Sequence, residues 1–396
     1  MKRLILFLIT SIVIGHSYAQ QYGWVVLNAD SIPGTPDFSD VFFVNDDTGW
    51  IASGSHAEIY HTTDGGQSFE VQTTQYNCLA IWMLNAIEGY AGGTNGRVYR
   101  TIDGGDNWIA HGSMGITLVD ISFPPNGEKG YACGLNGAIC SIDSSGVSAM
   151  NSYVNGNLYS ISFPIDSTEG WVCGGTIINH FKNSMWNLDQ TNPSGNYNAI
   201  YMLDSLAGWA AGDKIIHTIN GKNWSTQTNP DTLNGGRGMN GVFFLNANEG
   251  WIVGELGLIF KTSNGGSTWN IEGTGLTNAF LRGVHFTSST NGYVVGNNKT
   301  LLKYTQISGV EEHAAVSEIT IYPNPVKGEL FINLPTDHTK IESVNIMDLT
   351  GRLVKSESYK TFPQRVRINL NEVESGIYFC AVLVNGKQIT KKIIVY

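Results

Sequence analysis

Short apolar runs alternate with polar turns along most of the chain, and the alternation repeats. A glycine followed by Trp or Tyr marks each repeat, with one apolar run before it and another after it. The seven phrases are Gly49-Trp50, Gly89-Tyr90, Gly130-Tyr131, Gly170-Trp171, Gly208-Trp209, Gly250-Trp251 and Gly292-Tyr293. Successive glycines lie 38 to 42 residues apart, a period typical of repeated supersecondary units. A third apolar run and a polar turn that ends on an aromatic residue complete most units.

Four short strands in about 40 residues are typical of a propeller blade. The seven units therefore predict an all-β chain in which residues 20–306 form a seven-bladed β-propeller. Residues 22–30 precede the first complete unit and are similar to the fourth strand of a unit, whereas the seventh unit has no such strand after Tyr304. We expect the N-terminal strand to pair with the seventh blade and close the ring, because closure removes exposed sheet edges.

The polar turn after the third strand has the pattern Thr-x-Asp/Asn, then glycine, then an aromatic residue. Its Asp or Asn positions are Asp64, Asp103, Asn220 and Asn264. Such side chains accept N–H groups of their own turn and the glycines supply positive φ, so we assign these four residues a structural role. The turns resemble the Asp-box of bacterial neuraminidase-like repeats.

The chain begins with features of a secretory signal peptide. Lys2 and Arg3 precede an apolar run over residues 4–15, and Ser17 and Ala19 supply small residues before a cleavage site. Residues 1–19 therefore predict a signal peptide, too short for a stable membrane span. No other stretch is long and apolar enough to cross a bilayer, so we expect an exported protein without a membrane span.

Charge divides the rest of the chain into two parts. Residues 20–317 hold 11 Lys and Arg against 25 Asp and Glu, whereas residues 318–396 hold 10 against 8. An acidic first domain disfavours nucleic-acid binding, which depends on basic side chains that neutralise phosphates. The high content of glycine and aromatic residues, 47 Gly, 10 Trp and 17 Tyr, agrees with a secreted β protein.

Five cysteines cannot all form pairs. If Asn136-Gly137 forms a two-residue hairpin turn, Cys133 and Cys140 lie opposite each other. A disulfide between them and two reduced, buried thiols both remain open. Cys78, Cys173 and Cys380 are interpreted as buried and inert, and no cysteine or histidine spacing indicates a metal site, so we expect neither metal nor cofactor.

The glycine-aromatic phrase followed by Val/Ala-x-Gly, as in Gly250-Trp251-Ile252-Val253-Gly254, extends over residues 22–305. This region resembles the seven-bladed propellers of the photosystem II stability and assembly factors. Arginines on one face of those propellers are implicated in partner binding. The resemblance implies such a role for Arg237 and Arg282, which precede the first strands of the sixth and seventh blades. Two ordinary solvated arginines are the alternative.

The composition changes after a linker at residues 307–317. The motifs Ile319-Thr320-Ile321-Tyr322-Pro323-Asn324-Pro325, Ser375-Gly376-Ile377-Tyr378-Phe379 and the closing Lys391-Lys392-Ile393-Ile394-Val395-Tyr396 resemble the type A C-terminal sorting domain of the type IX (Por) secretion system. Their alternating apolar residues predict a small antiparallel β-sandwich at residues 318–396. The resemblance implies recognition by the outer-membrane translocon, followed by secretion or display at the cell surface.

Two functions compete for the propeller. The first is a non-catalytic module that binds a protein or glycan partner, and the second is a secreted Asp-box glycoside hydrolase that acts on polysaccharide. A glycosidase needs a pair of carboxylates about 5–10 Å apart. The candidates Asp40, Asp120, Asp213 and Glu255 belong to different units, and the sequence alone does not pair them. No nucleophile or metalloprotease motif is present, so we favour binding over catalysis.

Overall fold

The computed structural model describes most of the chain, namely residues 21–188, 190–231, 238–307, 319–334, 341–348, 352–359, 363, 365–384 and 387–396. Contacts divide the chain into two compact units, residues 1–307 and 308–396. The expected signal peptide, residues 308–317 of the expected linker and Arg237 lie outside the described residues. Regular structure in the described part consists of strands and short 3-10 turns, which confirms the predicted all-β class.

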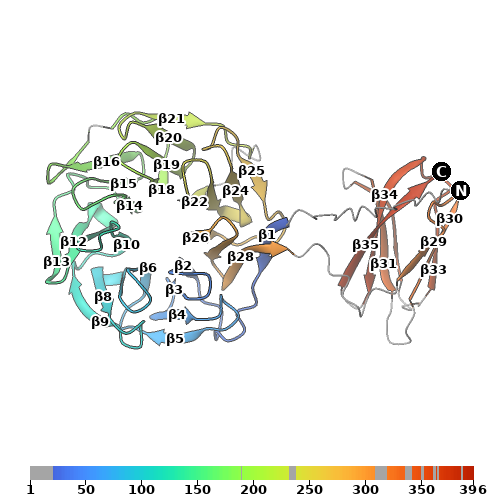
Figure 1. Ribbon diagram of the computed structural model, residues 1–396, viewed down its shortest axis with the longest axis horizontal. Helices are drawn as coiled ribbons and strands as arrows, with labels where there is room; N and C mark the ends of the chain where they lie inside the picture. The colour runs from blue at the N-terminus through green and yellow to red at the C-terminus, as the bar shows by residue number, and fades with distance from the viewer. Residues whose placement is uncertain are drawn as a thin grey trace, which may run out of the picture. The chain divides into compact units, whose positions relative to one another are not determined.

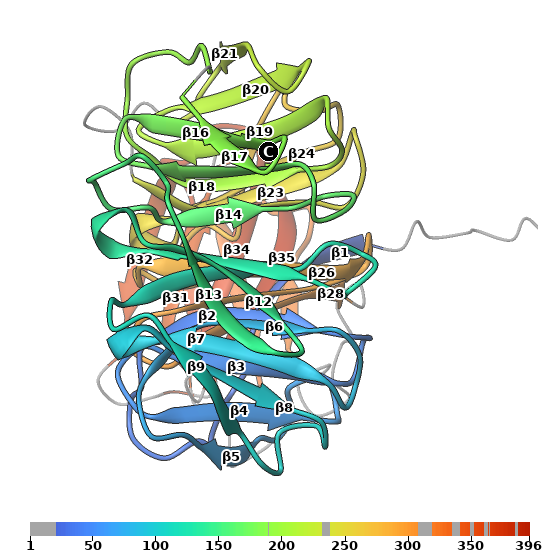
Figure 2. The ribbon, with the colours of Figure 1, turned by 90° about the vertical axis from the view of Figure 1, so that its left-hand side faces the viewer.

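Seven four-stranded antiparallel sheets follow one another around a ring in the first unit (Figure 1). We call them blades 1 to 7 in chain order. Blades 1 to 4 consist of β2 (Phe38–Phe43), β3 (Gly49–Ser53), β4 (Glu58–Thr62) and β5 (Glu70–Thr73); β6 (Cys78–Met83), β7 (Gly89–Gly93), β8 (Arg97–Thr101) and β9 (Ile109–Ser113); β10 (Leu118–Ser122), β11 (Gly130–Gly134), β12 (Ile139–Asp143) and β13 (Gly146–Met150); and β14 (Ser160–Ser162), β15 (Gly170–Gly174), β16 (Ile177–Lys182) and β17 (Met185–Asn187). Blades 5 to 7 consist of β18 (Tyr197–Met202), β19 (Ala207–Gly212), β20 (Ile215–Ile219) and β21 (Trp224–Gln227); β22 (Met239–Phe244), β23 (Gly250–Gly254), β24 (Ile259–Thr262) and β25 (Asn270–Glu272); and β26 (Leu281–Ser288), β27 (Asn291–Gly296), β28 (Thr300–Ile307) and β1 (Gln21–Val26). The first strand of each blade is innermost, and outer strands such as β5, β9 and β13 lie on the perimeter (Figures 1 and 2).

Blade 7 takes its outermost strand from the start of the described chain. β1 pairs antiparallel with β28, with Tyr22 opposite Gln306 and Val26 opposite Leu302. The Trp24 ring packs edge-on against Tyr304, and its Nε1 donates a hydrogen bond of 3.0 Å to Glu272 Oε2 in blade 6. The N-terminal strand therefore joins the last blade to the one before it.

The glycine of each glycine-aromatic phrase leaves room for the last inner-strand side chain of its own blade. A Cβ on Gly49 would lie 2.4 Å from the Phe43 ring, and a Cβ on Gly250 would lie 2.5 Å from the Phe244 ring. The same inner-strand ring also stacks on the aromatic residue of the preceding blade's phrase. Five such pairs have ring centroids 3.5 to 4.6 Å apart: Tyr293–Phe43, Tyr90–Phe123, Tyr131–Phe163, Trp209–Phe244 and Trp251–Phe286. Stacked aromatic pairs contribute about 0.5–1.5 kcal/mol beyond the burial of their area.

Tryptophans of the phrases also form hydrogen bonds to the next blade. Trp50 Nε1 donates to Gly104 O at 2.9 Å, and Trp209 Nε1 donates to Gly265 O at 3.1 Å. Both acceptors lie in the polar turn of the following blade. Trp251 Nε1 is buried with no hydrogen-bond partner, because blade 7 ends in β1 and has no such turn to offer. Ring stacking therefore joins five of the seven interfaces, a methionine takes the ring's place at the other two, and several interfaces gain a hydrogen bond as well.

The polar turns themselves are held by their Asp or Asn side chains. Asp64 Oδ1 accepts the Ser68 N–H at 2.9 Å, and Asn264 Oδ1 accepts the Thr268 N–H at 2.9 Å. Asp103 and Asn220 accept N–H groups of their own turns in a similar way. These bonds are the local contacts expected of a structural turn.

The cysteine register differs from the prediction. Cys133 pairs with Ile139 and Ala132 pairs with Cys140, because the hairpin turn holds three residues, Leu135–Gly137, rather than two. A shift of one residue sends the two side chains to opposite faces of the sheet. Cys133 accordingly packs toward blade 4 and Cys140 toward blade 2, and all five cysteines are free and buried. The disulfide that the sequence left open is therefore not formed.

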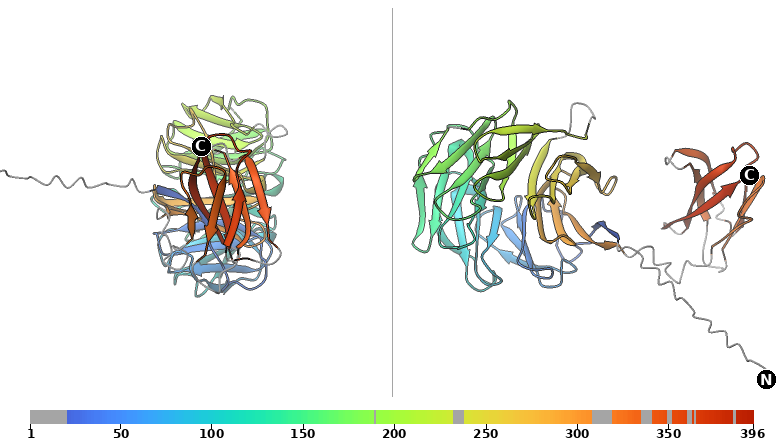
Figure 3. Two further views of the ribbon diagram at one scale, coloured as in Figure 1. Left: turned by 90° about the vertical axis from the view of Figure 1, so that its right-hand side faces the viewer. Right: turned by 45° about the horizontal axis from the view of Figure 1, so that its top comes forward.

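The second unit contains two antiparallel sheets (Figure 3). One consists of β29 (Thr320–Tyr322), β30 (Glu329–Asn333) and β33 (Arg365–Asn369), and the other of β32 (Leu353–Ser358), β31 (Ile341–Met347), β34 (Gly376–Val384) and β35 (Lys387–Val395). Both sheets contribute to a single apolar core, with Leu330 and Ile368 from the first and Val344 and Val382 from the second. This unit therefore buries its own apolar face and needs no contribution from the ring.

Deletion of residues 22–30 should destabilise the ring. The deletion removes β1 from blade 7, exposes the edge of β28 and leaves Glu272 without its Trp24 contact. We expect a lower melting temperature and association through the exposed edge, measured by calorimetry and light scattering with the chain from residue 20 as control. An unchanged melting temperature and a monodisperse monomer would contradict this role of β1.

Candidate functional site

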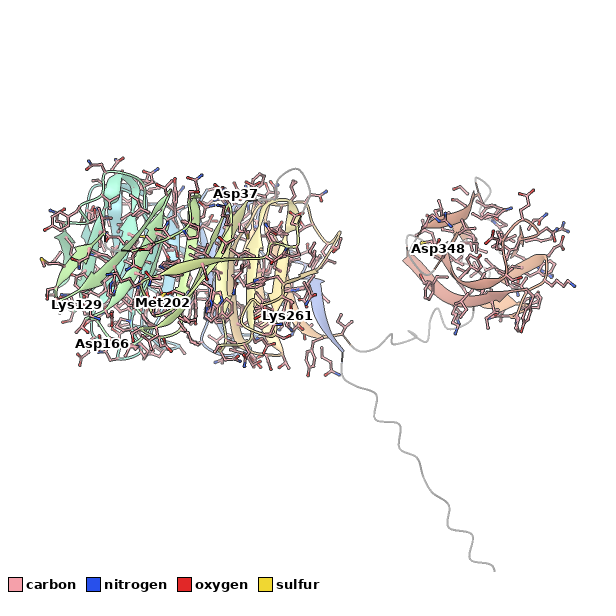
Figure 4. All side chains as sticks on the ribbon, turned by 90° about the horizontal axis from the view of Figure 1, so that it is seen from above. Asp37, Lys129, Asp166, Met202, Lys261 and Asp348 are labelled. Atoms are coloured by element: carbon pink, nitrogen blue, oxygen red, sulfur yellow. The ribbon has the colours of Figure 1, made fainter. Side chains whose placement is uncertain are left out.

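The innermost strands of all seven blades line a central cavity of about 860 Å³. These strands all begin on one face of the ring, which we call the mouth face. Figure 4 shows Asp37, which precedes β2, on this face, and Asp166, which follows β14, on the opposite face. Its volume exceeds that of two other pockets in the described part of the chain, about 730 and 560 Å³, and we take it as the candidate binding site.

Five aromatic side chains form a continuous arc on the cavity wall. The arc, in spatial order from blade 2 through blades 1, 7, 6 and 5, consists of Trp82, Phe42, His285, Phe243 and Tyr201. Neighbouring ring centroids lie 4.5 to 5.2 Å apart. Blades 3 and 4 place Ser122 and Ser162 at the corresponding positions, where each hydroxyl accepts a backbone N–H of the next blade. The wall is therefore aromatic on one side and polar on the other.

Two carboxylates, the acidic pair, lie two residues before this level on blades 1 and 3. Asp40 accepts the N–H groups of Val41 and Ile81, at 2.8 and 2.9 Å, so it connects blade 1 to blade 2. Asp120 accepts those of Ile121 and Ile161, both at 2.8 Å, and connects blade 3 to blade 4. Every oxygen of the pair accepts a backbone hydrogen bond, which fixes both carboxylates at the cavity wall.

Burial raises the pKa of both members of the acidic pair. Loss of hydration and repulsion from Asp120 raise the pKa of Asp40 to about 8, although two backbone hydrogen bonds oppose the shift. Loss of hydration raises the pKa of Asp120 to about 6 against hydrogen bonds from Ile161, Ser160 and Ile121. Asp40 and Asp120 belong to different blades and line the same cavity. The sequence could not pair them because 80 positions separate them.

The other titratable groups near the pair are neutral at physiological pH. Burial lowers the pKa of His285 to about 4 and raises that of Tyr201 to about 12. Burial and the Asp120 charge raise the pKa of Cys133 and Cys173 well above the usual range. At neutral pH the acidic pair is therefore the only source of charge among these groups.

Arg282 lies at the mouth of the cavity. It is the second residue of β26 rather than a residue before the strand, its side chain is exposed, and its Nε donates a 2.7 Å hydrogen bond to Asn297 Oδ1. Its proposed companion, Arg237, lies outside the described residues. The structure therefore places one of the two arginines beside the cavity.

The four predicted turn residues lie on the face opposite the mouth. Asp64, Asp103, Asn220 and Asn264 each follow the third strand of a blade, where that strand ends away from the mouth face. Partial burial raises the pKa of Asp64, but hydrogen bonds from Ser68 and Thr62 outweigh it and lower the pKa to about 2. Hydrogen bonds from Asn107 and Thr101 likewise lower the pKa of Asp103 to about 2. These residues do not approach the cavity.

The remaining carboxylates that the sequence suggested do not join the acidic pair. Asp213 is exposed and accepts hydrogen bonds from Asn196, and Glu255 accepts the Gly238 N–H in a turn on the mouth face. The aromatic arc was not predicted from the sequence. In five of the seven blades, the residue directly before the Phe or Met that packs against the phrase glycine is aromatic. This pattern could have predicted the arc.

In the described part of the chain, no three His, Cys, Asp or Glu side chains gather so as to hold a metal ion. The same residues contain no helix long and apolar enough to cross a membrane.

Comparison with known protein families separates the two units. Residues 320–396 match the secretion system C-terminal sorting domain. This match indicates export by the type IX secretion system to the cell surface or the medium. Residues 198–305 match the photosynthesis system II assembly factor YCF48. Both resemblances drawn from the sequence motifs are thereby confirmed.

Solved structures resemble the first unit. A structure described as YCF48 bound to D1 peptide is 21% identical, with a TM-score of 0.58, and the alignment covers 73% of this chain and 96% of that one. YCF48 from Cyanidioschyzon merolae is 18% identical, with a TM-score of 0.58 and coverage of 72% and 98%. Virginiamycin B lyase from Staphylococcus aureus is 14% identical, with a TM-score of 0.61 and coverage of 72% and 100%. Identities this low establish the propeller fold and nothing about function. No curated protein sequence matches the chain.

Asp40 should make the folded state less stable as the pH rises. Its pKa is higher in the folded chain than in the unfolded one, so the folded state holds the extra proton and loses stability as that proton leaves. Between pH 6.5 and 8 the histidines with lowered pKa are already neutral and the buried thiols are not yet ionised. We expect the free energy of unfolding to fall by about 1–2 kcal/mol over this window, measured by urea denaturation. Asp40→Asn should remove most of the slope, and an equal slope in the variant would contradict the assignment.

Proposed function

We propose that the first unit is an exported, non-catalytic binding module that holds a protein or glycan partner at the mouth of its central cavity. The observation that carries the proposal is a cavity of about 860 Å³ with one aromatic and one polar wall, bordered by the exposed Arg282. Cavities with a large apolar surface and a few fixed polar groups are typical ligand sites. Aromatic side chains and arginine also supply much of the affinity at protein interfaces.

The similarity to YCF48 supports a partner-binding role. One solved structure of YCF48 contains a D1 peptide, so a ring of this architecture holds a segment of another protein there. Transfer of this role to the present chain rests on fold alone. The nature of the partner must therefore come from the chemistry of the cavity.

The acidic pair favours a second candidate, a secreted glycoside hydrolase. A carboxyl with a pKa near 8 keeps its proton at neutral pH, which a general acid requires. However, each oxygen of the pair already accepts a backbone N–H and connects two blades. Carboxylates held in this way support the architecture of the wall, so we prefer the binding module. Hydrolysis of any polysaccharide, lost in Asp40→Asn, would reverse this preference.

The second unit, which matches the sorting domain, determines where the binding module acts. We propose that the translocon recognises residues 318–396, and that the propeller afterwards works in the medium or on the cell surface. An acidic ring with a defined cavity suits capture of a partner outside the cell.

Loss of Arg282 should weaken partner capture. The chain from residue 20, probed against arrays of glycans and peptides, should bind a ligand that carries a carboxylate or sulfate. Arg282→Ala should lower the affinity about 10- to 100-fold, because a hydrogen bond to a charged group contributes about 1.5–3 kcal/mol. The double variant with Arg237→Ala should abolish capture.

A matched control for this experiment is Lys182→Ala. Lys182 is an exposed cation on the opposite face, where it pairs with Glu169. Its loss removes one positive charge, as Arg282→Ala does, but leaves the residues at the mouth unchanged. Wild-type affinity in the double arginine variant, measured by calorimetry, would remove both arginines from the site.

Removal of residues 318–396 should leave the propeller in the periplasm. The ring keeps its own core when the second unit is removed, so the truncated chain should fold but lack the sorting signal. Cell fractionation of the native host measures the outcome, with the full chain as control. Truncated protein at the surface or in the medium would contradict the role of this unit.

A further inference from the structure

The acidic pair and the aromatic arc lie close together on the cavity wall. β2 carries one member of each, Asp40 of the pair and Phe42 of the arc. The two residues are two positions apart, a separation of about 6–7 Å along a strand. Both also line the same cavity from other blades, with Asp120 on blade 3 and Trp82 on blade 2. A single group in the cavity can therefore contact a carboxylate and a ring face together.

Both features present negative potential to the cavity. The carboxylates repel each other, and no cation of the described wall lies between them. Faces of aromatic rings carry the negative end of their quadrupole and attract cations within about 6 Å. Arg282 is the one Lys or Arg among the described lining residues, and its Nε is bonded at the mouth to Asn297. Apart from Arg282 at the mouth, the described lining residues include no Lys or Arg to balance the negative potential of the wall.

His285 contributes a neutral aromatic ring to the cavity wall. Its ring lies 4.5 Å from Phe42 and 5.2 Å from Phe243, between the two phenyl rings of the arc. Its Nδ1 is shielded from solvent and has no hydrogen-bond partner, so the ring behaves as a neutral member of the arc. A charged imidazole here would repel a cation, whereas the neutral ring extends the aromatic surface.

We propose that the cavity binds an organic cation, the side-chain ammonium group of a lysine residue presented by a protein partner. This inference rests on the proposed function, since the partner is held at the mouth of the cavity. The ammonium group lies between the acidic pair and the arc, in contact with ring faces, and the flexible butyl stem extends toward the mouth. Lysine suits the site because its charge is compact and its stem is flexible and apolar.

A pair of matched small molecules tests the site directly. Nα-acetyl-lysine methylamide and its neutral counterpart Nα-acetyl-norleucine methylamide differ in the terminal ammonium group. The chain from residue 20 to 396, examined by ligand-observed NMR titration at pH 8.5, should bind the lysine probe at least tenfold more tightly. Equal affinity for the two probes would overturn the proposal, because the cavity would then be a merely apolar site. Tighter binding of the corresponding arginine derivative, or of a monosaccharide, than of the lysine probe would also overturn it.

Substitutions then locate the bound probe. Asp40→Asn combined with Asp120→Asn should lower the affinity for the lysine probe at least tenfold, and Phe42→Leu should lower it about threefold or more. The control is Glu70→Gln combined with Asp106→Asn, which removes the same charge from exposed positions outside the cavity and should leave the affinity unchanged. Thermal melting identifies any variant that fails to fold. In that case Phe42→Leu, which retains the carboxylates and their interblade bonds, decides the outcome.

The pH profile supplies a readout that needs no substitution. Tyr159 and Arg282 also line the cavity. Among the groups near the acidic pair whose pKa is shifted, namely Asp40, Asp120, His285, Tyr201, Cys133 and Cys173, only the two aspartates change charge between pH 5.5 and 8.5. Lysine stays charged throughout this range. Affinity for the lysine probe should therefore rise at least tenfold from pH 5.5 to 8.5. A flat profile would overturn the proposal.

The two proposals fail in different ways. If the array ligand binds and is sensitive to Arg282→Ala while the lysine probe does not bind, the module remains and the cation site is wrong. If the lysine probe binds with the expected charge and pH dependence while no peptide or glycan is captured at the mouth, the cavity site stands and the wider binding role fails.

Discussion

Every interface in the ring depends on contact between the aromatic residue of one blade's second strand and the inner strand of the next blade. Trp209 of blade 5 illustrates it: its ring stacks 3.5 Å from Phe244 of blade 6, and its Nε1 is bonded to Gly265 O of that blade. Gly250 permits the contact, since any side chain there would displace Phe244. A propeller has no single core, so this unit must be repeated to hold the ring together.

The same arrangement leaves the cavity wall free to differ from blade to blade. The interblade clusters are built from residues that point into the interfaces, such as Trp209 with Phe244 and Trp269. Inner-strand residues that point toward the axis contribute less to those clusters. Blade 1 can therefore carry Asp40 and Phe42 where blade 3 carries Asp120 and Ser122, with the same strand pairing in both. An asymmetric wall on a nearly symmetric scaffold is what selective binding requires.

The sorting domain and the ring are two separately packed units. The second unit buries residues of both its sheets in one core, and its sequence match indicates delivery through the type IX secretion system. The acidic surplus lies in the first unit, outside the part responsible for sorting. Negative charge on an exported ring steers cationic ligands toward it and repels anionic ones over distances comparable to the Debye length. The charge of the ring therefore attracts a cationic group such as the ammonium proposed for the cavity, whereas an anionic group of a partner depends on the local cation Arg282 at the mouth.

The sequence by itself determined the repeating architecture, the residues of the polar turns and the sorting unit. Each of these depends on patterns within about 40 residues, where strand periodicity, positive-φ glycines and Asx hydrogen bonds are encoded locally. Tertiary structure alone decided the cysteine register, because an Asn-Gly pair fits a hairpin of two residues as well as one of three, and the packing of Cys133 and Cys140 against different blades selects between them. It also decided the composition of the cavity. Asp40 and Asp120 lie in separate blades, as do the five rings of the aromatic arc, and each set lines one cavity only when the ring closes. Their common wall is a property of the closed ring that no single repeat contains.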